Sequence, residues 1–327
     1  MKSKFLLILL SFTLVLGLLS GCAGPGPGSE KNAPPGRSTP PEGDTSSDVT
    51  EIEAGGELPY IKGVCSISAG SCHTIGLRSD GTVIGAGWNK YGQLEVDGWK
   101  DIVAVSARDC HAVGLKSDGT VVGVGYDGFG QLNISEWKDI VAISTGLWKT
   151  VGLRSDGTAV AAGENDHAQL DVGEWKDLVA ISAGEFHTVG LKSDGTVVAK
   201  GYYKHGRTKV GEWKDIEAIS AGSSHTVGLK SDGTVIAIGN NFHGQLDVGG
   251  WKDIVAVLTG WESTIGLKSD GTVVATGRNY DGQLDVGEWK DIVAISAGNS
   301  HTVGLKSDGS VVVAGDKEFA QIGAGDW

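Results

Sequence analysis

Short apolar runs, each bounded by turn residues, recur along most of this chain and predict a fold built from β-strands. In one representative repeat the pattern predicts strands over residues 101–107, 111–116 and 121–125, since each run is short, apolar and rich in β-branched residues. The Asp-Gly pair at Asp118 is a strong hairpin signal, because Gly accepts a positive φ. Residues 131–134 leave open a weak fourth strand. Runs that are apolar on both faces predict sheets packed on both sides.

This unit recurs every 38 residues without a shift. Two short motifs recur with this period. Trp-Lys-Asp occurs six times and is followed by a lone Trp327, and Asp-Gly occurs seven times. Periods of this order are typical of propellers and solenoids. An open stack needs polar capping repeats, whereas the first repeat only lacks its Trp, with Ile61 in that position, and in a closed ring Trp327 would fill the gap. The sequence therefore predicts an all-β fold: a seven-bladed β-propeller over residues 61–327, with short 38-residue blades of three strands plus the weak fourth.

Residues 1–21 are predicted to be a lipoprotein signal peptide. Lys2 and Lys4 precede an apolar stretch at residues 5–19, which is shorter than the ~20 residues of a comfortable membrane span. The Leu-Ser-Gly-Cys sequence that ends at Cys22 resembles the bacterial lipobox, and this resemblance implies cleavage before Cys22 and acylation of its thiol. The alternative is an ordinary secretory signal with a chance cysteine.

Residues 22–60 are predicted to be a lipid-anchored, flexible linker, because they contain all seven prolines, many Gly and Ser residues, and too little apolar surface for a core. Signal and linker together predict an extracytoplasmic domain in a bacterial cell envelope. The lipid on Cys22 would hold it at the outer face of the cytoplasmic membrane.

The formal net charge of −13 argues against nucleic acid as a partner, because an acidic surface repels phosphate backbones. Cys72 and Cys110 occupy equivalent positions in adjacent repeats. A disulfide between them is one option. Partly buried thiols are the expectation, because equivalent blade positions can exceed the ~7 Å Cα limit for bridging. We also expect the protein to be a monomer.

Five histidines begin the second strand of their repeats and form a column: His73, His111, His187, His225 and His301. Lys149 and Ser263 interrupt the column, so we interpret it as structural, bonding the backbone at the blade edge, and expect no metal site. No nucleophile–base set, phosphate loop or carboxylate pair stands out from the repeat. We therefore expect no cofactor and no enzymatic activity.

The unit I-V-A-I-S-A-G-x-x-H-T-V-G-L-K-S-D-G-T-V-V-A-x-G-x-N-x-x-G-Q-L is clearest over residues 218–246. It resembles the repeat of the regulator of chromosome condensation family, and the resemblance covers all seven units. The short period is closer to bacterial members, such as the secreted β-lactamase inhibitor protein II, than to the eukaryotic nuclear exchange factor. The longer blades and protruding element of that factor have no counterpart here. In the inhibitor, aromatic residues between the first and second strands contact the target enzyme. Trp148, Phe186 and Trp261 match that position.

Two windows vary among the seven repeats: the two residues before the His column, and the four residues after the third strand. Alternating strand directions predict that both windows open on one face, opposite the Ser-Asp-Gly turns. That face is rich in aromatic residues: Trp88, Tyr91, Tyr126, Phe129, Trp148, Phe186, Tyr202, Tyr203, Phe242, Trp261, Tyr280 and Phe319. Aromatic residues on loops held by a rigid scaffold are typical interface anchors, although we expect about half of these rings to be structural. Glu185 and Glu262, beside the anchors, favour a partner with basic groups.

The sequence thus predicts a surface-tethered, non-enzymatic binding module whose aromatic loop face binds an unidentified protein, with Trp148, Phe186 and Trp261 as anchors. The alternative is an inhibitor of a β-lactamase or of a penicillin-binding protein. Binding of a wall polysaccharide is a less favoured alternative. Hydrolysis at the central channel is also less favoured, because no catalytic set is present.

Overall fold

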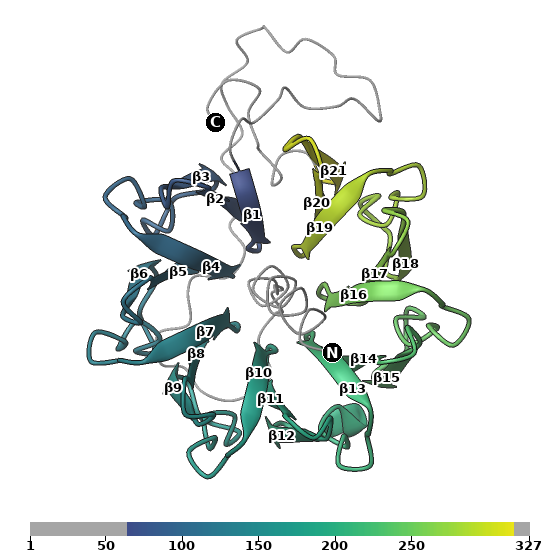
Figure 1. Cartoon of the computed structure of the whole chain (residues 1–327), viewed down its shortest axis with the longest axis horizontal. Coiled ribbons are helices and arrows are strands. Elements are labelled where there is room, and N and C mark those ends of the chain that lie inside the picture. Colours follow the sequence, from purple (N-terminus) through teal and green to yellow (C-terminus); the bar gives the residue numbers. More distant parts are fainter. Residues whose placement is uncertain (1–63, 317–327) are drawn as a thin grey trace, which may run out of the picture.

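The computed structural model describes residues 64–316, which form a ring of seven three-stranded antiparallel sheets (Figure 1). Blades 1–3 comprise β1(Val64–Ala69), β2(His73–Arg78), β3(Val83–Gly87); β4(Ile102–Arg108), β5(His111–Lys116), β6(Val121–Gly125); and β7(Ile140–Thr145), β8(Lys149–Arg154), β9(Ala159–Gly163). Blades 4 and 5 comprise β10(Leu178–Ala183), β11(His187–Lys192), β12(Val197–Gly201), η1(Lys204–Gly206); and β13(Ile216–Ala221), β14(His225–Lys230), β15(Val235–Gly239). Blades 6 and 7 comprise β16(Ile254–Thr259), β17(Ser263–Lys268), β18(Val273–Gly277); and β19(Ile292–Ala297), β20(His301–Lys306), β21(Val311–Gly315).

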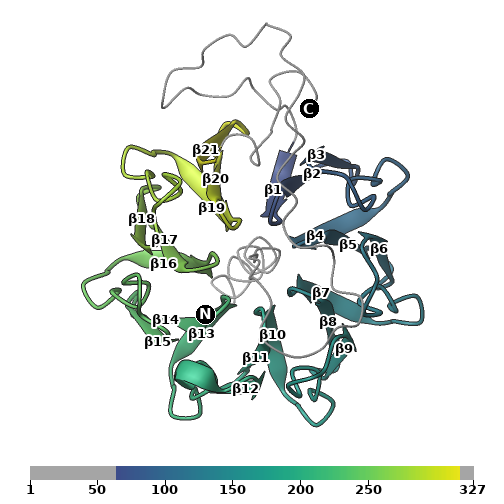
Figure 2. The ribbon, with the colours of Figure 1, turned by 180° about the vertical axis from the view of Figure 1, so that it is seen from behind.

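The first strand of each blade lies nearest the central axis, and blade 7 lies beside blade 1 in both views of the ring (Figures 1 and 2). The ring is closed by the same contact that joins neighbouring blades elsewhere. The amide of Ala69 donates to Ser296 Oγ of blade 7 at 2.8 Å, just as Ala107 donates to Ser68 Oγ at 2.9 Å. One apolar cluster joins β1 to blade 7, with Ile67 packed among blade 7 side chains such as Val303. The predicted closed propeller is therefore confirmed. Trp327 lies outside the described residues.

No blade within residues 64–316 forms the weak fourth strand that the sequence left open. The segment after each third strand instead makes consecutive turns. In blade 2 the amide of Asn133 donates to Gly130 O at 3.1 Å, and that of Ile134 to Leu132 O at 2.8 Å. These turns place Trp137 against the next blade, and the amide of Trp137 donates to Ile134 O. The segment thus serves as a connection between blades.

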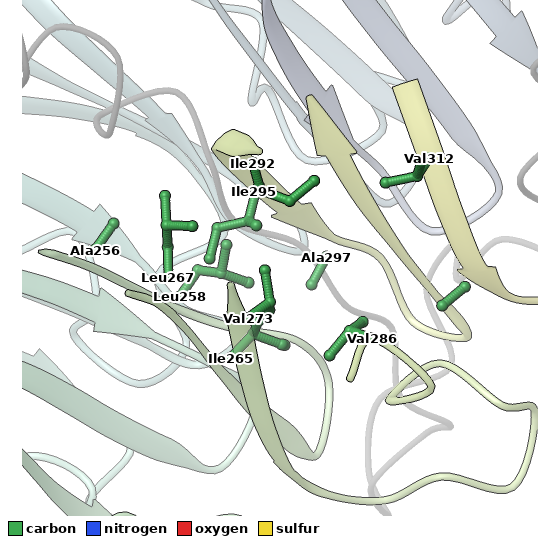
Figure 3. Packing of buried hydrophobic residues seen from close by; sticks show 11 residues of the cluster. Ala256, Leu258, Ile265, Leu267, Val273, Val286, Ile292, Ile295, Ala297 and Val312 are labelled. Carbon is green, nitrogen blue, oxygen red and sulfur yellow. The ribbon is translucent and has the colours of Figure 1, made fainter. Parts of the chain in front are cut away.

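Each apolar cluster is built from two neighbouring blades. In Figure 3, Ile265 and Val273 of blade 6 face Ile292 and Ile295 of blade 7. The repeated Trp fills the space between blades, as predicted. A glycine in the second strand makes room for it: a Cβ built on Gly114 would lie 2.8 Å from the ring of Trp99.

The ring has two ends of different character. The start of each second strand pairs with the end of its third strand, as His73 does with Gly87, so both variable windows lie at one end. We call this end the loop face. The Asp-Gly turns form the opposite end, the turn face, where Gly119 has φ +80° and Asp118 accepts from the amide of Thr120 at 2.9 Å. Within the described residues, η1 is the one helical element, and no helix could cross a membrane.

Candidate functional site: the loop face

The loops of the loop face are fixed to the scaffold by backbone hydrogen bonds. The first residue after each third strand donates to the loop between the first two strands, as Trp88 does to Cys72 O at 2.8 Å. A buried glutamine then holds the following turn: Gln93 Oε1 accepts from the amide of Tyr91 at 3.0 Å. The same glutamine contact recurs in blades 2, 3, 5 and 6. The loops therefore present their side chains from a rigid base.

A continuous row of rings crosses blades 1 to 3. Its successive centroids are 5.4, 5.2, 6.2 and 4.7 Å apart, and its members are Trp88, Tyr91, Tyr126, Phe129 and Trp148. The last pair is stacked, whereas the others meet edge to face. These offset and edge-on arrangements are the favourable ones for aromatic pairs. The row places the predicted anchor Trp148 at the end of a band of rings.

The other two predicted anchors lie in separate groups. Phe186 contacts the rings of His167 and Tyr202, with centroids 5.9 and 6.4 Å away. Trp261 is covered by the guanidinium of Arg278, 4.8 Å from its centroid, and Arg278 also lies over Tyr280. The structure therefore does not bring Trp148, Phe186 and Trp261 into one cluster.

Exposure separates the aromatic residues of the loop face into two kinds. Tyr203, Phe242 and Tyr280 are 78%, 81% and 75% exposed, and Trp88 is 40% exposed. The half-buried rings are Tyr91, Tyr126, Phe129, Trp148, Phe186, Tyr202 and Trp261. Phe319 lies outside the described residues. The three most exposed rings come from the loops after the third strands of blades 4, 5 and 6.

Glu185 does not face a partner, contrary to the sequence-based expectation. Its side chain is 2% exposed, among Lys149, Arg108 and Arg207. Burial raises the pKa of the Glu185 carboxyl to about 7 and lowers the pKa of the Lys149 ammonium to about 7. Glu262 remains partly exposed, with Oε2 3.2 Å from His243 Nε2.

Lys149 joins the two loops that carry Trp148 and Phe186. Its Nζ donates to Glu185 O at 2.8 Å and also to Gly184 O. Sequence reasoning missed this buried charged group, although a signal was present. Three basic residues each occupy a position that holds another residue type in most repeats. Arg108 stands in place of a Gly, Lys149 in place of a His, and Arg207 in place of a Gln.

The histidine column holds neighbouring blades together. His187 Nε2 lies 2.8 Å from Thr226 Oγ1 of the next blade, and Thr226 Oγ1 donates to Arg207 O at 2.7 Å. Since the hydroxyl proton is used in that second bond, His187 Nε2 is the donor in the first. The side-chain partner of His187 is therefore a threonine, whereas the predicted backbone hydrogen bonds are present at His111 with Lys149 and at His225 with Ser263. Burial lowers the pKa of His225 to about 3, so its imidazole is neutral near pH 7.

Residues 64–316 contain no group of three or more His, Cys, Asp or Glu side chains that could hold a metal ion. No disulfide joins Cys65, Cys72 and Cys110 in this part of the chain. Burial and the neighbouring Asp109 carboxylate raise the pKa of the Cys110 thiol far above its usual range.

The comparisons with known proteins agree with this architecture. The regulator of chromosome condensation (RCC1) repeat is found at five positions, residues 64–93, 178–206, 216–245, 251–283 and 292–326. Blades 2 and 3, with Arg108 and Lys149, lie outside these segments. No curated protein sequence matches the chain.

Several solved structures are similar to this one. The CRINKLY WD40 ectodomain of the Arabidopsis thaliana receptor kinase ACR4 matches with a TM-score of 0.65 and 22% identity, over 77% of this chain and 95% of that chain. Human WBSCR16 matches with a TM-score of 0.62 and 14% identity, over 79% and 87%. Prp20p from Saccharomyces cerevisiae matches with a TM-score of 0.59 and 18% identity, over 79% and 84%; its structure was described with its binding properties to Gsp1p and histones. A further structure has Kap60 bound to Prp20. At these identities the similarity shows a shared propeller fold.

Proposed function

We propose that this chain is a non-enzymatic binding module, tethered to the outer face of a bacterial cytoplasmic membrane through a lipid on Cys22, and that its loop face binds a protein partner. The observation that carries this proposal is the division of the ring into two ends. The turn face repeats nearly the same residues seven times, whereas the loop face differs in every blade and carries the aromatic side chains.

Rigidity and exposure support the loop face as an interface. Its loops are held by repeated backbone and glutamine contacts, so little conformational entropy is lost when a partner binds. Exposed rings such as Phe242 and Tyr280 contribute large apolar area, and aromatic residues are enriched among interface hot spots. The similar propeller Prp20p is described as binding Gsp1p and histones, which supports a protein as the kind of partner.

The main alternative is inhibition of a β-lactamase or a penicillin-binding protein. Trp148, Phe186 and Trp261 occupy the loop position through which the resembling bacterial inhibitor contacts its enzyme. All three rings are half-buried in this chain, so an enzyme surface would meet the more exposed rings around them as well. Inhibition assays against a panel of both enzyme classes test this alternative. If micromolar protein inhibits none of them, the inhibitor hypothesis is rejected and the general binding function remains.

The experiment for the binding function is affinity capture from a cell-envelope extract with the full chain. A triple variant, Trp148→Ala, Phe186→Ala and Trp261→Ala, should lose the captured partner. Single hot-spot truncations cost about 2 kcal/mol or more, which corresponds to roughly 30-fold in affinity.

The matched control for this capture changes the turn face. The double variant Lys116→Ala and Lys192→Ala should retain the partner. Circular dichroism establishes that each variant is folded. A folded triple variant that captures the same partner equally well would place the binding surface elsewhere.

A further inference from the structure

The loop after the third strand of blade 4 has a charge opposite to that of the whole protein. Residues 200–209 contain Lys200, Lys204, Arg207 and Lys209 and no acidic residue. The equivalent ten-residue windows of the other six blades have formal charges between 0 and −3, in a chain whose net charge is −13. Lys209, for example, occupies the position of Asp247 in blade 5 and Asp285 in blade 6.

The backbone of this loop also differs from that of the other blades, and two substitutions accompany the difference. Tyr203 replaces the Asn or Asp whose Oδ1 accepts from a loop amide in blades 1, 2, 3, 5 and 6. Arg207 replaces the glutamine whose side-chain oxygen accepts from the loop in blades 1, 2, 3, 5 and 6. A guanidinium has no acceptor, so Arg207 donates instead, to Lys204 O at 3.1 Å and to Ser223 O at 2.6 Å. The loop forms the 3₁₀ turn η1, and His205 adopts φ +61°.

The reorganised loop exposes its polar and aromatic side chains together. Lys200, Tyr203, Lys204, His205 and Lys209 are all exposed, and Tyr203 is 78% exposed. The ring of His205 lies edge to face with that of Phe242 in blade 5, with centroids 6.3 Å apart. Arg207 is buried beneath these side chains, and its hydrogen bond to Ser223 O holds the loop against the next blade. We call this surface, made of Lys200, Tyr203, Lys204, His205, Lys209 and Phe242, the basic-aromatic patch.

We propose that the basic-aromatic patch binds an acidic segment of the protein partner, one in which Asp or Glu residues alternate with apolar or aromatic residues. This inference rests on the proposed function, because it assigns the partner's chemistry at one part of the loop face. It reverses the charge expected from the sequence, since the exposed charges of this patch are basic while Glu185 is buried.

Both components of the patch determine the kind of partner. Lysine side chains attract carboxylates and increase the rate of association with an acidic surface. Tyr203 and Phe242 supply exposed apolar area that a polyphosphate or a purely anionic polysaccharide would leave unused. A protein segment that carries both carboxylates and apolar side chains uses the whole patch.

The test measures binding of labelled synthetic peptides to the full chain by fluorescence anisotropy, at low and at physiological ionic strength. The probe alternates Asp and Glu with Leu and Tyr, its neutral companion has Asn and Gln in place of the acids, and inorganic polyphosphate serves as a competitor. Each exposed ion pair contributes little by itself, so the test reverses three charges together. The triple variant Lys200→Glu, Lys204→Glu and Lys209→Glu should therefore weaken binding of the acidic probe by about tenfold or more.

The control makes the same change of net charge on the opposite end of the ring. Lys138, Lys176 and Lys252 are exposed and belong to the Trp-Lys-Asp segments beside the turn face. Their triple change to Glu should alter binding by less than about twofold, because charges further apart than the Debye length are screened at physiological salt. Phe242→Ala should weaken binding of the acidic probe while leaving polyphosphate binding unchanged.

Three results would overturn the proposal. The turn-face control could weaken binding as much as the patch variant, the neutral peptide could bind as well as the acidic one, or polyphosphate could displace the probe with no dependence on Phe242, which would make the patch a general polyanion site. Envelope capture separates this inference from the proposed function. If the aromatic triple variant loses the partner and the charge-reversed variant keeps it, only the acidic-segment inference fails.

Discussion

The fit between the repeated tryptophan and the repeated glycine can be tested at the boundary of blades 4 and 5. Trp213 is 6% exposed and packs in a cluster with Leu191 of blade 4 and Ile216 of blade 5. An indole side chain buries about 150–250 Å², and at about 25 cal/mol per Å² this corresponds to about 4–6 kcal/mol. Since areas computed against an extended chain are upper bounds, Trp213→Ala should lower the free energy of unfolding by about 3–5 kcal/mol.

The glycine partner gives the sharper half of this prediction. A Cβ on Gly228 would lie 2.8 Å from Trp213 Cζ3 and 3.2 Å from Ile216 Cδ1, so Gly228→Ala should cost about 1–3 kcal/mol through overpacking. In the Trp213→Ala background the space is open, and the same change should cost much less. The two substitutions should therefore show a coupling energy in a double-mutant cycle.

Urea denaturation followed by circular dichroism measures all four variants, with unchanged slopes required before midpoints are compared. Gly211→Ala is the matched control, because no atom lies within 4 Å of a Cβ built there. It should change stability by less than about 0.5 kcal/mol. The reasoning is refuted if Gly228→Ala is as mild as Gly211→Ala, or if its cost is the same with and without the indole.

Three further predictions concern Cys22, Trp327 and Glu185. Mass spectrometry of the membrane fraction should find a diacylglyceryl group on an N-terminal Cys22. Cys22→Ala should release the domain from the membrane or block processing of the signal peptide, and cleavage at another site would contradict this. Trp327→Ala should lower the melting temperature of the whole domain, because Trp327 is predicted to fill the place that Ile61 leaves in the first repeat, and an unchanged melting curve would reject that role. The raised pKa of Glu185 means that its protonated form favours folding, so its contribution is complete below its usual value of 4.5 and is lost as the pH rises through about 7. The stability of the wild type relative to Glu185→Gln should therefore fall between these pH values, and a flat difference would show that the carboxyl does not titrate there.

The sequence alone determined the architecture, because each blade is specified locally and the specification recurs. Asp118 and the glycine after it set the hairpin, and Gly114 sets the distance at which Trp99 packs. A period of 38 residues repeated seven times then leaves a ring as the simplest way to cover every apolar face. The same alternation of strands correctly placed both variable windows on one face.

The tertiary structure alone decided which side chains of that face are accessible and what charge they present. The loop position of Glu185 is also buried at Ser71, Leu147 and Ser223, but three basic residues contributed by different blades surround the Glu185 carboxyl. The exposure of Phe242 and the half-burial of Trp148 likewise depend on rings from neighbouring blades. Contacts between blades join residues as far apart in the sequence as Phe129 and Trp148, Lys149 and Gly184, or Ala69 and Ser296. Local pattern carries no information on how such side chains fill the space between blades.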